Sequence, residues 1–236
     1  IYIAVFCITQ IKKMLLLGID IGTSSIKVAV VDIKSQKKIA TAHYPEQETE
    51  ILVHQPGWAE QDPANWWHNT QQAILKLIAS NQFDPKQVMA IGIAYQMHGL
   101  VAVDKTQKVL RNSIIWCDSR SINYGEEAFN AIGQERALAH LLNSPGNFTA
   151  AKLAWVKNNE PEIYSKIDKI MLPGDYIAME LTDEVTTSAA GLSEGIFWDF
   201  KNNEISKDVM NYFGFSEALI PEIKSVFTTH GYLKEN

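Results

Sequence analysis

The sequence predicts an α/β domain with a mixed sheet, and three observations lead to this prediction. Two apolar runs within residues 15–33 are joined by a short turn, which indicates a pair of antiparallel strands. Later apolar runs alternate with stretches of helical spacing, and such an order requires crossover connections. The chain has 236 residues, 46% hydrophobic and 20% charged, so it has room for one large core or two small ones.

The opening strand pair is followed by a third predicted strand at residues 38–44 and then by a long helix. Asp62 is a suitable N-cap for this helix, and Pro63 suits its first position. Five residues recur at helical spacing and should pack on the sheet: Trp66, Thr70, Ala73, Leu77 and Ile78.

A polar segment, Gln96-Met97-His98-Gly99, separates two predicted strands at residues 88–94 and 100–103. Strands on both sides would hold Gln96 and His98 at a sheet edge, where their side chains can reach a ligand. Taken by itself, His98 fits a surface or core histidine. We interpret the segment as the place where the chemistry occurs.

The second half of the chain is predicted to be mainly helical. The predicted elements are a helical region at 123–142 with a break near Gly133, helices at 150–157 and from Pro161, a strand at 167–172, a helix at 173–181, strands or turns at 185–200 and a last helix at 207–213.

Charge and cysteine content exclude some classes of partner. The net charge is -6 without a Lys/Arg cluster, which argues against nucleic acid. The two cysteines, Cys7 and Cys117, lie far apart, which favours a reducing compartment and predicts a cytoplasmic protein. Residues 1–11 are too short to span a bilayer and lack a basic leader, so no membrane anchor is expected. We interpret residues 1–13 as an extension of unclear origin and residues 14–236 as the domain.

The turn of the opening strand pair carries Asp20, followed by Gly22, Thr23, Ser24 and Ser25. Gly22 allows the backbone to turn without a Cβ clash, and successive N–H groups of such a turn form a nest for anionic oxygens. A carboxylate such as Asp20 can hold Mg²⁺ directly or through water. The turn therefore fits a metal-phosphate site, and a β-hairpin with a polar tip is the alternative.

Four segments, taken in order and spacing, carry a resemblance to a known family. They are Gly18-Ile-Asp-Ile-Gly-Thr-Ser-Ser25, Trp58-Ala-Glu-Gln-Asp-Pro63 with Trp66-Trp67, Gln96-Met-His-Gly99, and Phe148-Thr-Ala-Ala-Lys-Leu153 continued by Leu172-Pro-Gly-Asp-Tyr176 and Leu181-Thr-Asp-Glu184. Together they resemble the amino-terminal domain of the FGGY family of carbohydrate kinases, and most closely its xylulokinases.

The resemblance implies a ribonuclease-H-like fold of the actin and hexokinase superfamily, with a mixed sheet flanked by helices. It also implies two lobes, with sugar and ATP meeting in the cleft between them. This chain resembles the sugar-binding lobe, and we expect the carboxy-terminal nucleotide-binding lobe to be absent from it. The function implied for the full-length parent is ATP-dependent phosphorylation of D-xylulose to xylulose 5-phosphate in xylose metabolism.

The same resemblance implies roles for individual residues. Asp20 would act on Mg²⁺ and on the transferring phosphoryl group. The residues implied to face phosphate oxygens are Gly22, Thr23 and Ser24, and those implied to line the site of D-xylulose or a similar ketose are Gln96, Met97 and His98. Trp58 or Trp116 would provide an apolar wall.

Two positions depart from the family's pattern. The family's catalytic aspartate, which takes the proton of the attacking sugar hydroxyl, falls on Ser188 here, and serine is a poor base. Asp183 and Glu194 are acids nearby in the sequence, but neither lies at the matching position, so neither is assigned as the base. Tyr95 stands where the family usually has glycine and places a large ring beside the expected sugar site.

Several alternatives stay open or are disfavoured. A catalytically impaired sugar-binding or regulatory fragment agrees with Ser188, and other ketoses or polyols are alternative substrates. Gly191-Leu-Ser193-Glu-Gly195 matches the nucleophile elbow of hydrolases, with Asp199 or Asp208 and His230 following, but residues 196–200 suit a strand better than the helix an elbow needs. A metal hydrolase lacks a close histidine pair, and a nuclease lacks an acidic cluster.

Overall fold

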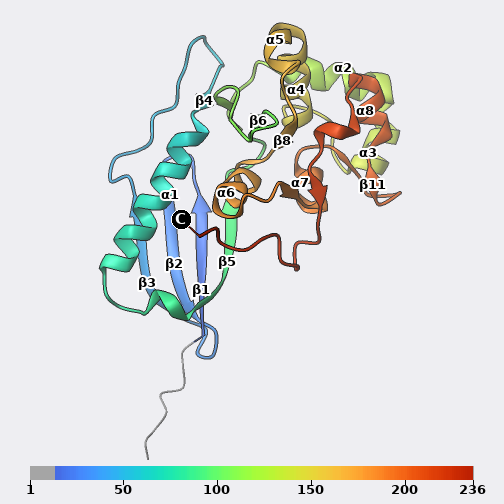
Figure 1. Ribbon diagram of the computed structural model, residues 1–236. Coiled ribbons are helices and arrows are strands. Elements are labelled where there is room, and N and C mark those ends of the chain that lie inside the picture. Colours follow the sequence, from blue (N-terminus) through green and yellow to red (C-terminus); the bar gives the residue numbers. More distant parts are fainter. Residues whose placement is uncertain (1–13, 236) are drawn as a thin grey trace, which may run out of the picture.

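The computed structural model describes residues 14–235 and contains a mixed four-stranded sheet in the order β3-β2-β1-β5 (Figure 1). The strands are β1 (Leu15–Ile21), β2 (Ile26–Asp32), β3 (Lys37–Tyr44) and β5 (Val88–Tyr95). The first three form an antiparallel meander, and β5 runs parallel to β1, so the predicted opening strand pair and mixed sheet are confirmed. The expected extension at residues 1–13 lies outside the described residues.

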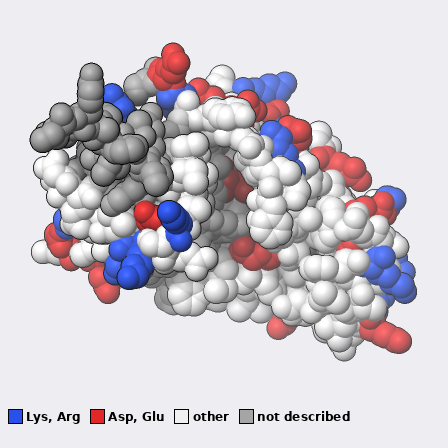
Figure 2. Space-filling model, turned by 90° about the horizontal axis from the view of Figure 1, so that it is seen from below, with Lys and Arg blue, Asp and Glu red and all other residues white. Residues whose placement is uncertain are grey.

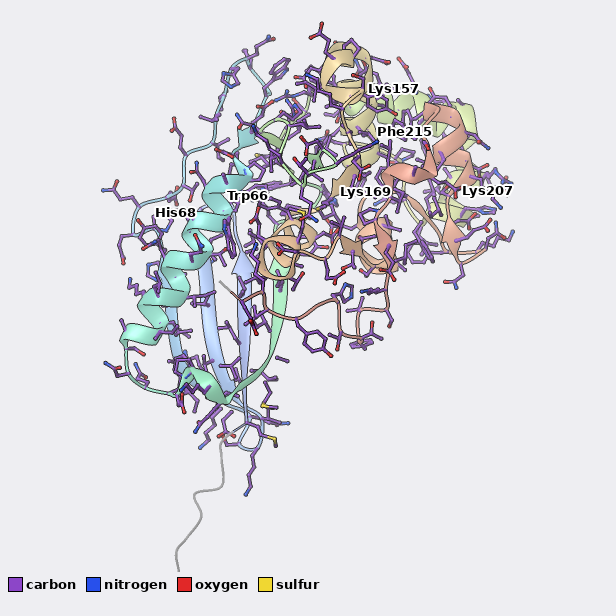
Figure 3. The ribbon with its side chains drawn as sticks, viewed as in Figure 1. Trp66, His68, Lys157, Lys169, Lys207 and Phe215 are labelled. Carbon is purple, nitrogen blue, oxygen red and sulfur yellow. The ribbon has the colours of Figure 1, made fainter. Side chains whose placement is uncertain are left out.

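Helix α1 (Pro63–Ala79) covers one face of this sheet. Its N-cap is Asp62, whose carboxylate accepts a hydrogen bond from the backbone N–H of Ala64, so the predicted helix start is confirmed. Figure 3 shows Trp66 on the sheet side of α1 and His68 on its outer side, in agreement with their burial and exposure.

The prediction that Ile78 packs on the sheet is wrong, because its side chain is 38% exposed. Trp66, Thr70, Ala73 and Leu77 are buried and follow one another at intervals of three or four residues. Ile78 directly follows Leu77, and one residue corresponds to about 100° of helical rotation. It therefore lies off the buried stripe.

Strand β1 alternates strictly between buried and exposed residues. Its inward side chains join the core beneath α1, whereas Leu16, Gly18 and Asp20 lie on the opposite, open face of the sheet. Met89 of β5 is 67% exposed on the same sheet. The strand that carries Asp20 thus contributes to the core with every second residue and presents the others to solvent.

The predicted helices and short strands of the second half mostly agree with the structure. The helices are α2 (Ile122–Ile132), α3 (Gln134–Leu141), α4 (Thr149–Asn159), α5 (Pro161–Tyr164), α6 (Pro173–Thr182), α7 (Ala189–Glu194) and α8 (Lys207–Phe213), with short 3₁₀ turns η1 (Pro85–Gln87) and η2 (Glu217–Leu219). The short strands are β4 (Glu60–Gln61), β6 (Val101–Val103), β7 (Ser113–Ile114), β8 (Lys169–Met171), β9 (Thr186–Thr187), β10 (Trp198–Asp199), β11 (Glu204–Ile205) and β12 (Glu222–Ile223).

Two features differ from the prediction. Helix α7 occupies part of the region 185–200, for which strands or turns were expected. The strand after the polar segment, β6, pairs with β8 in a separate two-stranded sheet and not with the main sheet. Residues 96–99 therefore connect the main sheet to the second half of the molecule.

Two hydrophobic clusters form the core. One joins the main sheet, α1 and α6, and the other joins α3, α4, α7 and α8. Phe215 belongs to the second cluster and lies near Lys157 of α4, whose Nζ is 5.6 Å from the Phe215 ring centroid (Figure 3).

Among residues 14–235, no helix is both long enough and apolar enough to cross a bilayer.

Candidate functional site

The tip of the β1–β2 hairpin has the geometry expected of a tight turn. The backbone N–H of Gly22 donates to the carbonyl oxygen of Ser25 at 3.2 Å. A Cβ atom at residue 22 would lie 2.8 Å from that oxygen, which explains why glycine occupies the position. Within the described residues, the backbone N–H groups of Thr23 and Ser24 donate no hydrogen bond, so both are available to an anion.

Asp20 lies next to this tip on the open face of the sheet. Its side chain is 51% exposed, and its carboxylate is 3.5 Å from Nζ of Lys27. Both side chains border an open hollow of about 930 Å³, whose lining also includes Gly18, Thr41 and Gly92. Figure 2 shows the surface hollowed on this lower side of the molecule, with acidic side chains inside the hollow. Asp20 is thus an accessible carboxylate.

A group of hydrogen bonds joins the hairpin tip to the polar segment after β5. The Thr23 hydroxyl donates to Oε1 of Gln96 at 3.1 Å, and Nε2 of Gln96 donates to Oε1 of Gln61 at 3.1 Å. Nε2 of Gln61 in turn donates to the carbonyl oxygen of Thr23 in the hairpin tip at 2.8 Å. Because β1 and β5 are parallel, their carboxyl ends meet at one edge of the sheet, which brings these two segments together.

The hydroxyl of Thr23 is used within this group, because it also accepts a hydrogen bond from Nε1 of Trp116 at 2.9 Å. What Thr23 offers to a phosphate is therefore its backbone N–H. Trp116 is 47% exposed beside the hairpin tip, as an apolar wall requires. Trp58 instead packs against Trp155, with a ring centroid distance of 5.2 Å, and is partly buried against the core.

His98 is held firmly in the polar segment, in a left-handed backbone conformation with φ of 60°. Its backbone N–H donates to the Glu194 carboxylate, and its Nδ1 is 3.2 Å from the Glu194 carbonyl oxygen. The imidazole packs edge-on against Phe148 with a centroid distance of 4.3 Å. Lys152 donates from Nζ to the carbonyl oxygen of His98 at 2.7 Å.

Burial and the nearby charge of Lys152 lower the pKa of His98 to about 4. The imidazole is therefore neutral at neutral pH and can exchange hydrogen bonds with a hydroxyl group. Met97, the residue before it, is 53% exposed. The segment thus presents one partly buried, neutral imidazole and one accessible apolar side chain.

Ser188 is the N-cap of α7, and its Oγ accepts a hydrogen bond from the backbone N–H of Gly191 at 3.1 Å. This role is structural, because the Ser188 side chain begins a helix.

Sequence reasoning named Glu194, at the other end of α7, only as a nearby acid and assigned it no role. Its carboxylate contacts His98, and it interacts with the Tyr95 hydroxyl and with the charge of Lys152. Burial raises the pKa of Glu194 above its usual value. A signal was present in the sequence, since Glu194 is the only charged residue within 185–198.

Tyr95 turns its ring toward α6 and α7. A Cβ atom at Gly174 would lie 2.1 Å from the Tyr95 ring, so the large side chain fits because residue 174 is glycine. Asp175, the next residue, accepts hydrogen bonds from the Thr187 hydroxyl at 2.9 Å and from the Leu172 backbone N–H at 3.3 Å. Burial raises the pKa of Asp175 to about 7.

A buried ionic network, which sequence reasoning missed, lies behind the site. Arg120 contacts Asp118 and Glu60, each at 2.7 Å, and Arg111 contacts the same Glu60 at 2.7 Å. The Arg120 guanidinium also lies 3.8 Å from the Trp58 ring centroid. Removing one member would leave a buried charge without its partner, so the network fixes the segments that carry Gln61 and Trp116.

The hydrolase interpretation has no support in the geometry. Ser193 lies inside α7 and not at a turn between strand and helix, and its hydroxyl donates to the carbonyl oxygen of Ala190 at 2.7 Å. His230 lies 2.9 Å from the Thr186 hydroxyl instead. The acids proposed as partners bind elsewhere, Asp199 to His140 and Asp208 to Arg136. Within residues 14–235, no group of three or more His, Cys, Asp or Glu side chains is placed to hold a metal ion.

Comparisons with known proteins agree with the fold and with the motifs. Residues 15–236 match the model of the amino-terminal domain of the FGGY family of carbohydrate kinases. A xylulose kinase of Escherichia coli K12 is 37% identical over 194 residues, which are 82% of this chain and 38% of that protein. A xylulose kinase of Staphylococcus epidermidis is 33% identical, over 94% of this chain and 42% of its own length.

A solved structure from Brucella ovis, described as a xyloylose kinase, superposes with a TM-score of 0.85 at 31% identity, over 93% of this chain and 45% of its own. The chain therefore spans about two fifths of the length of the curated relatives it matches.

Proposed function

The chain belongs to the FGGY family of carbohydrate kinases, as its amino-terminal domain, and we propose that it is the sugar-binding lobe of a kinase that phosphorylates D-xylulose with ATP. The observation that carries this proposal is the hydrogen bond between Thr23 and Gln96. It joins a turn with free backbone N–H groups to a segment that presents a neutral imidazole. This contact supports the proposal, because it joins the turn proposed to bind phosphate to the segment proposed to bind a sugar hydroxyl.

Phosphoryl transfer needs positioned reactants and stabilisation of charge on the phosphate oxygens. The free N–H groups of Thr23 and Ser24 are suitable donors to those oxygens. His98, Gln96 and Met97 would hold the sugar, with Trp116 as an apolar wall. In this proposal the adenosine of ATP is bound by a carboxy-terminal lobe, which closes the cleft.

Asp20 is the residue that would hold Mg²⁺. Mg²⁺ keeps several waters and is commonly bound by one or two carboxylates together with substrate phosphates. An accessible carboxylate at the border of the hollow meets that requirement, and no acidic cluster is needed. When bound, the metal would neutralise charge on the phosphate oxygens.

A kinase for another ketose or for a polyol is the second candidate. The Tyr95 ring occupies space where the family usually has glycine, and it alters the surroundings of His98 through Glu194. Panels of ketoses and polyols, compared by their affinity for the chain, would rank these substrates.

The test of the proposal is calorimetric titration of the chain with D-xylulose. We expect measurable binding, and we expect His98→Ala to weaken it about five- to thirtyfold, because a partly buried imidazole that hydrogen-bonds a sugar hydroxyl contributes about 1–2 kcal/mol. His54→Ala is the matched control, since His54 is exposed and lies outside the site. Unchanged affinity of His98→Ala would remove His98 from the pocket, and binding of ATP without any sugar would contradict the assignment of this lobe.

A further inference from the structure

The proposed reaction needs an acceptor for the proton of the sugar hydroxyl, and Ser188 does not supply one. Its Oγ is engaged as the N-cap of α7. The same helix ends at Glu194, and thereby places a carboxylate within reach of the polar segment. The two residues lie at opposite ends of one short helix.

The Glu194 carboxylate lies beside the His98 imidazole. Its Oε1 lies 3.5 Å from Nδ1 of His98, and the two side chains are 25% and 21% exposed, respectively. The backbone N–H of His98 donates to the same carboxylate, which fixes its orientation. A hydroxyl group bound at the imidazole would thus lie beside a carboxylate that is mostly shielded from water.

Four groups, from different parts of the chain, surround this carboxylate. Burial raises the pKa of Glu194, and the His98 N–H, the Tyr95 hydroxyl from β5 and the Lys152 ammonium from α4 act in the opposite direction. The Asp175 carboxyl from α6 is the acidic neighbour, and its own pKa is raised in part by Glu194. A base functions best with a pKa near the working pH, so burial improves Glu194 for this purpose.

The other candidates are weaker. Burial lowers the pKa of His98 to about 4, so its imidazole is no stronger a base than an ordinary carboxylate. Asp20 is open to solvent and paired with Lys27. Asp183, the other acid near the family's position, is 62% exposed and paired with Lys234 at 2.9 Å.

We propose that Glu194 is the general base of this kinase and replaces the aspartate that the family places at Ser188. Its carboxylate accepts the proton of the attacking sugar hydroxyl while the sugar oxygen bonds to the terminal phosphorus of a nucleoside triphosphate. The bond between that phosphorus and the bridging oxygen breaks, the nucleoside diphosphate leaves, and the proton then passes from Glu194 to solvent. The assignment rests on the proposed function.

The experiment compares Glu194→Gln with the matched control Asp183→Asn in the full-length kinase that carries this domain. Glutamine keeps an oxygen that accepts the His98 N–H, so we expect the unfolding temperature and KM for D-xylulose to change little. General-base catalysis contributes about 10²- to 10⁴-fold, so kcat should fall by that factor. The decrease of kcat/KM toward acidic pH should disappear in Glu194→Gln, because the titrating base is gone. Asp183→Asn should keep the wild-type kcat and the wild-type decrease of kcat/KM toward acidic pH.

The possible outcomes separate the two proposals. Wild-type enzyme without activity toward any ketose or polyol overturns the proposed function, and the role of Glu194 falls with it. The role of Glu194 alone is overturned if the wild type is active and Glu194→Gln keeps both the wild-type kcat and the decrease of kcat/KM toward acidic pH. A rise in KM without a fall in kcat would assign Glu194 to sugar binding and would also overturn the general-base role.

Discussion

At the scale of single residues, the site is defined by how charge is distributed around one neutral imidazole. Lys152 is buried, and burial lowers its pKa to about 8, although the charges of Asp118 and Glu194 act in the opposite direction. Its ammonium group is held by the carbonyl oxygen of His98. Burial first, and then this positive charge, lower the pKa of His98, so His98 stays neutral and the carboxylate of Glu194 remains the stronger proton acceptor.

Asp175 gives a pH prediction whose sign follows from its raised pKa. Its pKa is about 7 in the folded protein against an ordinary 3.8, so between these values the folded chain holds a proton that the unfolded chain has lost. The resulting stabilisation is complete below about pH 4 and is lost as the pH rises through 7. The free energy of unfolding of wild type, relative to Asp175→Asn, should fall over this range by at most about 1.4 kcal/mol per pH unit.

Urea titrations of both proteins at several pH values measure this difference. Asp183→Asn serves as the control, because this substitution also replaces an aspartate by asparagine, but at an exposed position. A wild-type minus Asp175→Asn difference that stays flat between pH 4 and 7 would show that the Asp175 carboxyl titrates normally.

At this scale, a contact could be predicted from the sequence when its two residues lie close together along the chain. The geometry of Gly22 depends on a neighbour three positions away, and the prediction of a close backbone approach is confirmed. Glu194 contacts His98 across 96 positions, and Arg120 contacts Glu60 across 60. A sequence pattern cannot reveal such pairs by local periodicity, because they arise only when the fold brings distant segments together.

At the scale of elements, long periodic segments were predictable and short ones were not. Helix α1 has 17 residues and a buried stripe, so its pattern and its cap agree with each other. Helix α7 has only 6 residues, contains Gly191 and is followed by Gly195, which gives it low intrinsic helix propensity. The Ser188 cap and the burial of Leu192 stabilise it in the folded chain, and neither is visible as periodicity.

The hairpin tip gives a prediction about stability. In Gly22→Ala, the new Cβ would approach the Ser25 carbonyl oxygen to 2.8 Å, and the backbone must shift. We expect the free energy of unfolding to decrease by about 1–3 kcal/mol. Gly92→Ala is the control, because a Cβ there meets nothing within 4 Å, and its stability should equal or slightly exceed that of wild type.

Both variants can be measured by urea denaturation with a constant m-value. Equal midpoints for Gly22→Ala and Gly92→Ala would contradict the tight turn. The same variants also report on phosphate binding, since only the change at residue 22 alters the position of the free N–H groups.

At the scale of the whole molecule, two hydrophobic clusters meet where the main sheet ends. The Thr23–Gln96 and His98–Glu194 contacts lie at this meeting point, so the site depends on how the two halves are joined. The sheet presents its open face, with Leu16 39% and Met89 67% exposed, to solvent. Within residues 14–235, the contacts that the proposed reaction uses thus join the two halves of the domain.

The polypeptide of residues 1–236 alone should therefore bind D-xylulose but phosphorylate it with no useful turnover. Holding two reactants together contributes about 7–11 kcal/mol to such a transfer, and in the proposed function the adenosine is held by a carboxy-terminal lobe. Without that contact the terminal phosphate reaches the hairpin tip only by chance encounter. ADP release measured with D-xylulose, at matched concentrations of this polypeptide and of a complete FGGY kinase, tests the expectation. Comparable rates would show that the hairpin tip and the Glu194 region suffice for catalysis.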